Sequence, residues 1–222
     1  MTAPLPRFAS VVFDVDSTLT GIEGVNWLAD RRGPATAEFV HRLTDQVMAG
    51  ALPIEQAYAA RLERIAPTRD EVRTLGEAYR DAVAPDARSA IGALRGAGVR
   101  LVAVSGGLDA AVRPFCLDLG FADADVHAVR AQWNARGEYV GFDRESPLVT
   151  QTGKPTVVRA LALPRPILAV GDGSTDVEMK RGGVAEAFAA YVGFARRALV
   201  VAAADFVVES FDQLTALVAS QR

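Results

Sequence analysis

The sequence has few of the residues that build disulfides, zinc sites and nucleic-acid surfaces. Its one cysteine, Cys116, excludes an intrachain disulfide, and its two histidines, His41 and His127, show no metal-ligand spacing. Cys116 lies in an apolar helical pattern typical of a buried thiol, and we expect structural or surface roles for both histidines. Lys and Arg number 24 against 27 Asp and Glu, without a basic block, so we expect no nucleic-acid partner.

Long hydrophobic runs are also missing. The longest apolar runs, such as residues 198–204, are too short to span a bilayer, and residues 1–7 lack the hydrophobic region of a signal peptide. We therefore expect no membrane partner and a cytoplasmic location. Half of the 222 residues are hydrophobic, 50%, which predicts a packed globular core, either as one domain or as a core domain with a smaller insertion.

Two kinds of pattern divide the chain. Residues 10–13 form a short apolar run typical of a buried parallel strand, and residues 24–82 follow with a helical period near 3.6 and no strand. From residue 85 onward, predicted strands and helices alternate, which is typical of an α/β fold with a parallel sheet. A helical block inserted after the first strand would form a lid over the carboxyl end of that strand.

The individual elements follow from periodicity, capping and turn signals. In the helical block we predict helices over residues 25–31 and 34–49, a third helix begun by Pro53, and a fourth begun by a capping box at residues 68–71. Beyond it we predict helices over residues 85–95, 108–119 and 154–163, strands over residues 99–104, 166–170 and 206–208, a hairpin of residues 126–131 with 138–142, and a terminal helix.

Polar residues follow three of the predicted strands. Asp14 and Asp16 follow the first, residues 105–107 (Ser-Gly-Gly) the second, and Asp172 and Asp176 the third. Because ligands bind outside the carboxyl ends of the strands in parallel sheets, we expect the three segments to converge on one site. Each segment alone has a simpler explanation: the aspartates would begin loops, and Ser-Gly-Gly would be an ordinary strand-to-helix turn.

The residue types at this edge suit a phosphate and a hard metal ion. Asp14 and Asp172 offer the carboxylate oxygens that Mg²⁺ prefers. Ser105 offers a hydroxyl, and the two glycines after it let backbone N–H groups approach an anion closely. Lys154, at the start of a helix, would neutralise phosphate oxygens, although a lone lysine is more often solvated.

Four segments together resemble the signature motifs of the haloacid dehalogenase superfamily: residues 14–18, residues 105–107, Lys154 and residues 171–176. More narrowly, the chain resembles the phosphoserine phosphatase family, on residues 14–24, 48–53 and 137–143 and on Arg61. The resemblance covers nearly the whole chain. It implies a Rossmann-like core of residues 1–20 and 83–222, with a small all-helical cap of residues 21–82 that sets substrate specificity.

The resemblance also implies a mechanism. Asp14 would be the nucleophile that forms an aspartyl-phosphate, and Asp16 would protonate the leaving alkoxide and later deprotonate water. Mg²⁺ would be held by Asp14, the backbone carbonyl of Asp16 and Asp172, with Asp176 supporting them. The phosphoryl oxygens would be bound by Ser105, Gly106, Gly107 and Lys154.

For the substrate, the resemblance assigns the ammonium to Glu23 and the carboxylate to Arg61, a pairing that suits an α-amino acid. Met48, Ala49 and Thr175 would complete the substrate site, with Ala49 standing where the family commonly has glycine. The implied activity is hydrolysis of O-phospho-L-serine to L-serine and phosphate, the last step of serine biosynthesis. The oligomeric state stays open between monomer and homodimer.

The sequence leaves other functions open. The same aspartyl-phosphate would transfer its phosphoryl group to a hydroxyl acceptor, so the main alternative is a phosphotransferase or a phosphatase for another small phosphorylated alcohol, such as phosphohomoserine. A binding or regulatory module without turnover is a weaker one, because Asp14, Asp16, Lys154 and Asp172 are all present. A nucleotide-sugar transferase would leave Ser-Gly-Gly and the lysine without a role.

Overall fold

A computed structural model of the chain describes residues 7–49 and 51–219. Its centre is a six-stranded sheet with the order β3-β2-β1-β6-β7-β8, and every neighbouring pair in it is parallel. The six strands are β1 (Ser10–Phe13), β2 (Arg100–Leu108), β3 (Val126–Val129), β6 (Ile167–Gly171), β7 (Ala187–Tyr191) and β8 (Phe206–Val208). The predicted α/β fold with a parallel, Rossmann-like core is confirmed.

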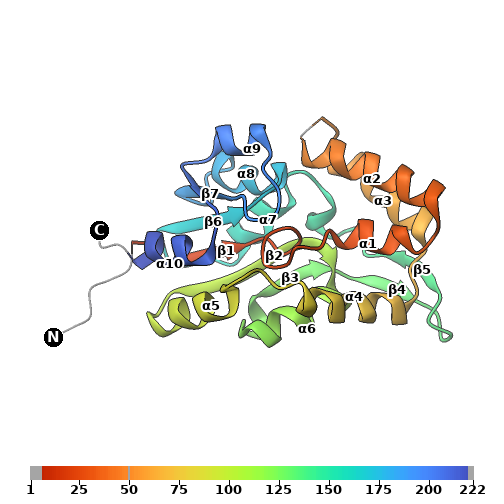
Figure 1. The fold of residues 1–222 in the computed structure, drawn as a ribbon, viewed down its shortest axis with the longest axis horizontal. Helices are drawn as coiled ribbons and strands as arrows, with labels where there is room; N and C mark the ends of the chain where they lie inside the picture. Colours follow the sequence, from red (N-terminus) through yellow and green to blue (C-terminus); the bar gives the residue numbers. More distant parts are fainter. Residues whose placement is uncertain (1–6, 50, 220–222) are drawn as a thin grey trace.

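Helices cover both faces of this sheet (Figure 1). On one face lie α5 (Ala87–Gly96), α6 (Asp109–Leu119) and α10 (Phe211–Ala219); on the other lie α7 (Gly153–Ala160), α8 (Ser174–Arg181) and α9 (Ala198–Ala203). Phe13 in β1 packs against the rings of Phe121 and Phe211, at centroid distances of 5.9 and 6.2 Å. Strand β1 is buried along its whole length, so apolar burial on two faces places it in the middle of the sheet.

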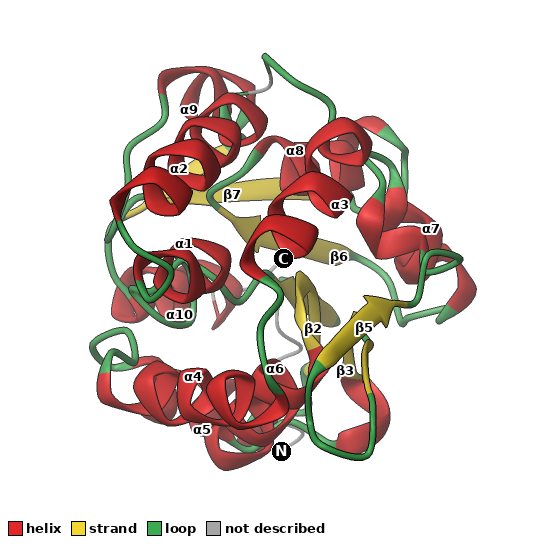
Figure 2. Cartoon of the chain, turned by 90° about the vertical axis from the view of Figure 1, so that its right-hand side faces the viewer, coloured by secondary structure: helices red, strands yellow, loops and turns green. Residues whose placement is uncertain are grey.

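The helical block lies beyond the carboxyl ends of the strands, at one end of the molecule. Its helices are α1 (Gly24–Asp30), α2 (Pro34–Met48), α3 (Ile54–Ile65) and α4 (Arg69–Asp81). Figure 2 views the molecule from this end and shows α1, α2 and α3 in front of the strands. Helix α4 instead packs along α6 of the core.

One contact begins the last helix of the block, and another lies beside the two ends of the block. The Thr68 hydroxyl accepts a hydrogen bond from the Glu71 N–H, and the Glu71 carboxylate accepts one from the Thr68 N–H, so the predicted capping box is confirmed. An isolated antiparallel bridge joins Thr20 to Val83. This bridge lies next to both ends of the predicted cap, residues 21–82, and the division into two domains stays a prediction.

The structure differs from the predicted strands in three places. Residues 126–129 join the main sheet beside β2, and only β4 (Ala131–Trp133) pairs with β5 (Tyr139–Phe142) in the expected hairpin. Strand β2 continues through Ser-Gly-Gly to Leu108, with an irregular register after Val104. Strand β7 was not predicted, because three of its five residues are alanine, which has a low strand propensity. Burial between β6 and β8 overrides that propensity.

The predictions for Cys116 and His41 agree with the structure. Cys116 is fully buried, and burial raises the pKa of its thiol. His41 lies partly exposed on α2, and its Nε2 is 2.9 Å from the Asp30 carboxylate. Within residues 7–49 and 51–219, no helix has the length and apolar character needed to cross a membrane.

Candidate active site

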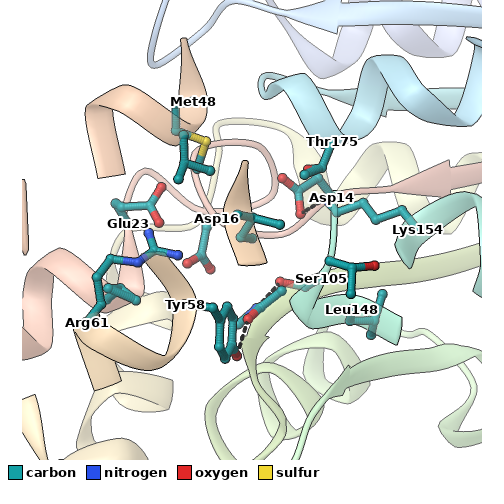
Figure 3. A pocket seen from close by; sticks show the side chains of 16 residues that line it. Asp14, Asp16, Glu23, Met48, Tyr58, Arg61, Ser105, Leu148, Lys154 and Thr175 are labelled. Atoms are coloured by element: carbon teal, nitrogen blue, oxygen red, sulfur yellow. Dashed lines mark hydrogen bonds and ion pairs between the residues drawn. The ribbon is translucent and has the colours of Figure 1, made fainter. Parts of the chain in front are cut away.

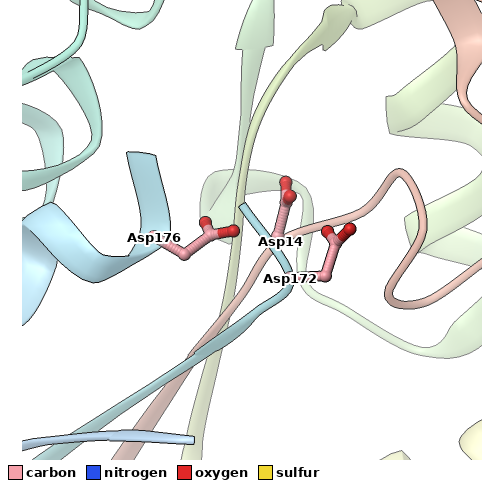
Figure 4. Close-up of side chains that lie close together, drawn as sticks. All are labelled: Asp14, Asp172 and Asp176. Atoms are coloured by element: carbon pink, nitrogen blue, oxygen red, sulfur yellow. The ribbon is translucent and has the colours of Figure 1, made fainter. Parts of the chain in front are cut away.

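The site lies where the strand order reverses, between β1 and β6. Asp14 follows β1, Asp172 follows β6, and Asp176 lies in the first turn of α8. One carboxylate oxygen from each residue lies within 4.8 Å of the other two. Figure 4 shows the three side chains close together. Open parallel sheets bind ligands in the crevice at such a switch point. The predicted convergence of strand ends on one place is therefore seen in the structure.

One buried cation pairs with two of these carboxylates. Lys154 Nζ lies 2.7 Å from Asp14 Oδ1 and 2.6 Å from Asp176 Oδ1. The preceding Gly153 lets α7 begin against the backbone of Pro147, where any larger side chain would collide. Burial alone would lower the pKa of Lys154, but the two carboxylates outweigh it and raise the pKa. Lys154 is therefore protonated at the carboxyl end of β1.

The remaining carboxylate oxygens fit a hard cation. Asp176 has both oxygens engaged, one by Lys154 and the other by the Gly173 N–H at 2.9 Å. Asp172, which the guanidinium of Arg197 contacts, lies beside Asp14. In the described part of the chain, the group contains neither His nor Cys, so its donors are the carboxylates that Mg²⁺ prefers. Asp14 and Asp172 have the chemistry to hold such an ion, while Asp176 orients Lys154.

Asp16 makes its contacts away from this carboxylate cluster. The Tyr79 hydroxyl donates to Asp16 Oδ1 at 2.6 Å, and the Gly24 backbone N–H donates to Oδ2 at 2.9 Å. A side chain on Gly24 would collide with the Tyr79 hydroxyl, so the arrangement requires glycine. Burial raises the pKa of Asp16 to about 6, although both hydrogen bonds act to lower it. A carboxyl group with this pKa gives and takes a proton near neutral pH.

The Ser-Gly-Gly segment lines the same pocket as Asp14 and Asp16. It is the extended end of β2, two residues before α6 begins, and not the strand-to-helix turn that was its simpler explanation. The Ser105 Oγ accepts a hydrogen bond from the Gly107 N–H at 2.9 Å. The N–H of Gly107 thus contacts Ser105 in this structure, and the Ser105 hydroxyl keeps its own hydrogen for another acceptor.

The opposite wall of the pocket comes from the cap helices. Glu23 stands just before α1 and Arg61 lies in α3, and their charged groups point toward each other beside Asp16 (Figure 3). Arg61 Nη1 donates to Thr44 Oγ1 at 3.1 Å. Among the described residues, Glu23 Oε2 and Arg61 Nε are buried without a hydrogen-bond partner. A ligand with both an ammonium and a carboxylate would satisfy these two atoms.

Burial also changes the charge state of this wall. It raises the pKa of Glu23 to about 8, with the neighbouring Asp16 carboxylate adding to the effect and Arg61 opposing it. Burial lowers the pKa of Arg61, which stays cationic because its ordinary pKa is far above neutral. The cap wall therefore has one permanent cation and one carboxyl group that titrates near neutral pH.

The pocket brings most of the predicted site residues together. Its wall contains Asp14, Asp16, Glu23, Met48, Arg61, Ser105, Gly106, Gly107, Lys154 and Thr175. Asp172 and Asp176 adjoin Asp14 behind that wall. Ala49 instead lines a neighbouring groove between α2, α8 and α9, so the structure does not bring it to the predicted substrate site. Gly50 of the same predicted motif lies outside the described residues.

Residues 11–181 match the haloacid dehalogenase-like hydrolase family. The chain belongs to this family. The phosphoserine phosphatase of Bos taurus is 33% identical over 208 residues, which cover 92% of this chain and 91% of that protein. That of Mus musculus is 35% identical over 172 residues, 76% of each chain. A phosphoserine phosphohydrolase-like protein from Francisella tularensis shares the fold, with a TM-score of 0.87 over 94% of this chain and 99% of that chain, at 23% identity.

The resemblance to the haloacid dehalogenase superfamily and to its phosphoserine phosphatases is confirmed by these matches. Three further residues of this haloacid dehalogenase-like site were not predicted: Tyr58 lines the pocket, Tyr79 binds Asp16, and Arg197 contacts Asp172. Tyr58 precedes Arg61 by three positions, a helical spacing that places both side chains on one face of the helix. This spacing could have predicted that Tyr58 lies near the site. Tyr79 and Arg197 have no such local signal, because they reach the site from distant elements.

Proposed function

We propose that the chain is a Mg²⁺-dependent phosphoserine phosphatase, which hydrolyses O-phospho-L-serine to L-serine and phosphate. The main support is the position of Glu23 and Arg61, which share one pocket with Asp14 and Asp16. A phosphorylated α-amino acid has a phosphate, an ammonium and a carboxylate, and the pocket offers a complementary group to each. The names of three curated relatives support the same substrate. These are the phosphoserine phosphatases of the two animals above and of the plant Arabidopsis thaliana, which are 31–35% identical to this chain.

Asp14 is the proposed nucleophile. Its carboxylate attacks phosphorus, and an oxygen–phosphorus bond forms while the bond from phosphorus to the serine oxygen breaks. Asp16 gives its proton to that serine oxygen. A water molecule then attacks the aspartyl-phosphate, Asp16 takes a proton from the water, and phosphate leaves as the bond to Asp14 breaks. The pKa of about 6 suits Asp16 to both proton transfers.

The phosphoryl oxygens would be bound from the sheet side of the pocket. Lys154 supplies a fixed positive charge, and the Ser105 hydroxyl and the Gly106 backbone N–H supply hydrogen bonds. Gly107 lines the same pocket, but its N–H donates to Ser105 Oγ and so supports that hydroxyl. When bound, Mg²⁺ would add positive charge that stabilises the transferring phosphoryl group. Asp14, Asp172 and the backbone carbonyl of Asp16 would hold it.

The amino-acid part of the substrate would be bound from the cap side. Glu23 binds the ammonium and Arg61 the carboxylate, while Met48 and Thr175 complete the wall. Ala49 receives no role, because it lies outside this wall. We propose residues 21–82 as the cap domain, residues 1–20 and 83–222 as the core, and cytoplasmic serine biosynthesis as the setting of the reaction.

A panel of phosphomonoesters tests the proposal, with kcat/KM measured in the presence of Mg²⁺. The panel contains O-phosphoserine, phosphoethanolamine without the carboxylate, 3-phosphoglycerate without the ammonium, sugar phosphates and nucleotides. We expect O-phosphoserine to be preferred over each analogue by at least about tenfold. A preference for a sugar phosphate or a nucleotide would overturn the proposal. A new phosphoester formed on added homoserine would identify a phosphotransferase instead.

A further inference from the structure

We propose that Tyr58 is a positioning residue for phosphoryl binding, which acts through the peptide group between Gly106 and Gly107 to aim the Ser105 hydroxyl into the pocket. The inference rests on the proposed function, in which Ser105 binds a phosphoryl oxygen. It gives a role to a cap residue whose hydroxyl binds a backbone carbonyl and that the reaction steps above do not use.

A continuous chain of hydrogen bonds supports the proposal. The Tyr58 hydroxyl donates to the Gly106 carbonyl oxygen at 2.8 Å, and the Gly107 N–H donates to Ser105 Oγ at 2.9 Å. The Gly106 carbonyl and the Gly107 N–H belong to one planar peptide group, so fixing one end fixes the direction of the other. Dashed lines in Figure 3 mark these contacts between Tyr58 and the segment that carries Ser105.

The direction of these hydrogen bonds determines whether Ser105 is free to donate its own hydrogen. A hydroxyl group has one hydrogen to donate and two lone pairs to accept. Because Ser105 Oγ accepts from Gly107, its hydrogen stays available for a phosphoryl oxygen in the pocket that Ser105 lines. Hydrogen bonds in series also polarise one another, so the Tyr58 donor strengthens the Gly107 donor. Burial raises the pKa of Tyr58, so its hydroxyl remains protonated and remains a donor.

The ring of Tyr58 is held independently of its hydroxyl. It packs edge-on against Phe142 of β5 with centroids 5.1 Å apart, and the residue is only 5% exposed. Removing the hydroxyl alone should therefore leave the ring and the fold in place. Tyr58 also shares α3 with Arg61, so one cap helix would recognise the substrate carboxylate and align the phosphate-binding hydroxyl. The cap would then contribute to the phosphoryl site as well as to specificity.

The first test compares Tyr58→Phe with a matched control, Tyr139→Phe. Tyr139 lies on the neighbouring β5, and among the described residues its hydroxyl has no hydrogen-bond partner. For Tyr58→Phe we expect a loss of about 5- to 10-fold in kcat/KM with both O-phosphoserine and p-nitrophenyl phosphate, the size of one lost hydrogen bond. Binding of inorganic phosphate, measured by calorimetry, should weaken by a similar factor. The melting temperature of Tyr58→Phe should fall by only about 2–4 °C, the size of one lost hydrogen bond. Tyr139→Phe should keep the kinetics and the phosphate affinity of the wild type.

A double-mutant cycle with Ser105→Ala separates positioning from packing. If Tyr58 acts through Ser105, Tyr58→Phe should cause no further loss of phosphate affinity in the Ser105→Ala background. An equal loss in both backgrounds, or no loss in the wild-type background, would overturn the inference. Phosphate affinity also distinguishes the two proposals: a chain that binds phosphate through Tyr58 and Ser105 but does not hydrolyse O-phosphoserine would overturn the proposed function alone.

Discussion

The two walls of the pocket differ in how they satisfy their buried charges. At the sheet edge, Lys154 pairs with Asp14 and Asp176 inside the protein. On the cap wall, Glu23 Oε2 and Arg61 Nε have no partner among the residues that the structure describes. The sheet edge is thus organised before a ligand arrives, which is what stabilisation of a developing phosphoryl charge requires.

The same difference predicts where substrate choice is made. A ligand that lacks an ammonium or a carboxylate would leave Glu23 or Arg61 buried and unpaired, and unpaired buried groups are costly. A change at the sheet edge should therefore affect every phosphomonoester alike. A change in the cap wall should affect O-phosphoserine more than substrates without its charged groups.

The largest effect is expected from Asp14→Asn, because the amide is a poor nucleophile and no aspartyl-phosphate would form. Turnover should fall by at least about 10⁴-fold for every substrate in the panel. Steady-state kinetics would measure the loss, and Asp212→Asn, an exposed aspartate of α10, would serve as the control. Turnover within tenfold of the wild type would exclude Asp14 as the nucleophile.

Metal removal should also act on all substrates equally. Dialysis against a chelator leaves Asp14 and Asp172 without the cation proposed between them, and we expect turnover to fall by more than about 100-fold. Added Mg²⁺ should restore turnover and raise the melting temperature, since a ligand that binds the folded state stabilises it. Full activity in the chelated protein would contradict the metal assignment.

Arg61→Gln should separate the two walls. It removes the proposed partner of the substrate carboxylate, so kcat/KM for O-phosphoserine should fall by about 100-fold. With p-nitrophenyl phosphate, which has no carboxylate, the loss should stay below about threefold. Arg64→Gln, an exposed arginine on the same helix, is the matched control. Equal losses with both substrates would assign Arg61 to the phosphoryl site or to folding.

The pKa of Glu23 predicts a pH dependence confined to substrates with an ammonium group. Because burial raises the pKa of Glu23 to about 8, the free enzyme carries a neutral Glu23 below that pH. Binding an ammonium favours the carboxylate, so KM for O-phosphoserine should rise as the pH falls below about 8, by up to about tenfold per pH unit. Glu23→Gln should remove this slope. A similar slope with p-nitrophenyl phosphate would point to another group.

The smallest effect concerns the cap away from the pocket. Thr68→Ala removes the hydroxyl of the capping box and should lower the free energy of unfolding by about 1 kcal/mol, without changing kinetics. Thr74→Ala, an exposed threonine of the same helix, is the control, and chemical denaturation measures both. A loss of activity in Thr68→Ala would show that cap stability and catalysis are coupled.

Glu71, the other half of the capping box, adds a pH-dependent contribution to stability. The Arg32 hydrogen bonds hold the pKa of Glu71 down at about 2. A carboxyl group with a lowered pKa stabilises the fold above its ordinary pKa, and this contribution is lost as the pH falls toward about 2. In Glu71→Gln, the free energy of unfolding should therefore fall less between about pH 4.5 and pH 2 than it falls in the wild type.

Local patterns predicted the elements whose signals lie within a few residues. The apolar run of β1, the capping box at Thr68 and the aspartates after β1 and β6 were all readable, because strand ends and helix starts have short-range chemistry. The convergence of those strand ends was also predictable, since a parallel sheet places its carboxyl ends at one edge. The proposed substrate-binding pair, Glu23 and Arg61, came only from the family resemblance.

Partner choice between distant segments depended on the tertiary structure. Residues 126–129 had the same apolar character whether they joined β5 or the main sheet, and packing beside β2 decided between the two. The alanines of β7 became a strand because burial between two others outweighed their propensity. The bond from Tyr58 to Gly106 joins positions 48 residues apart, and no local rule encodes such a contact. Periodicity reports which face of an element is buried, whereas only the folded chain specifies what that face meets.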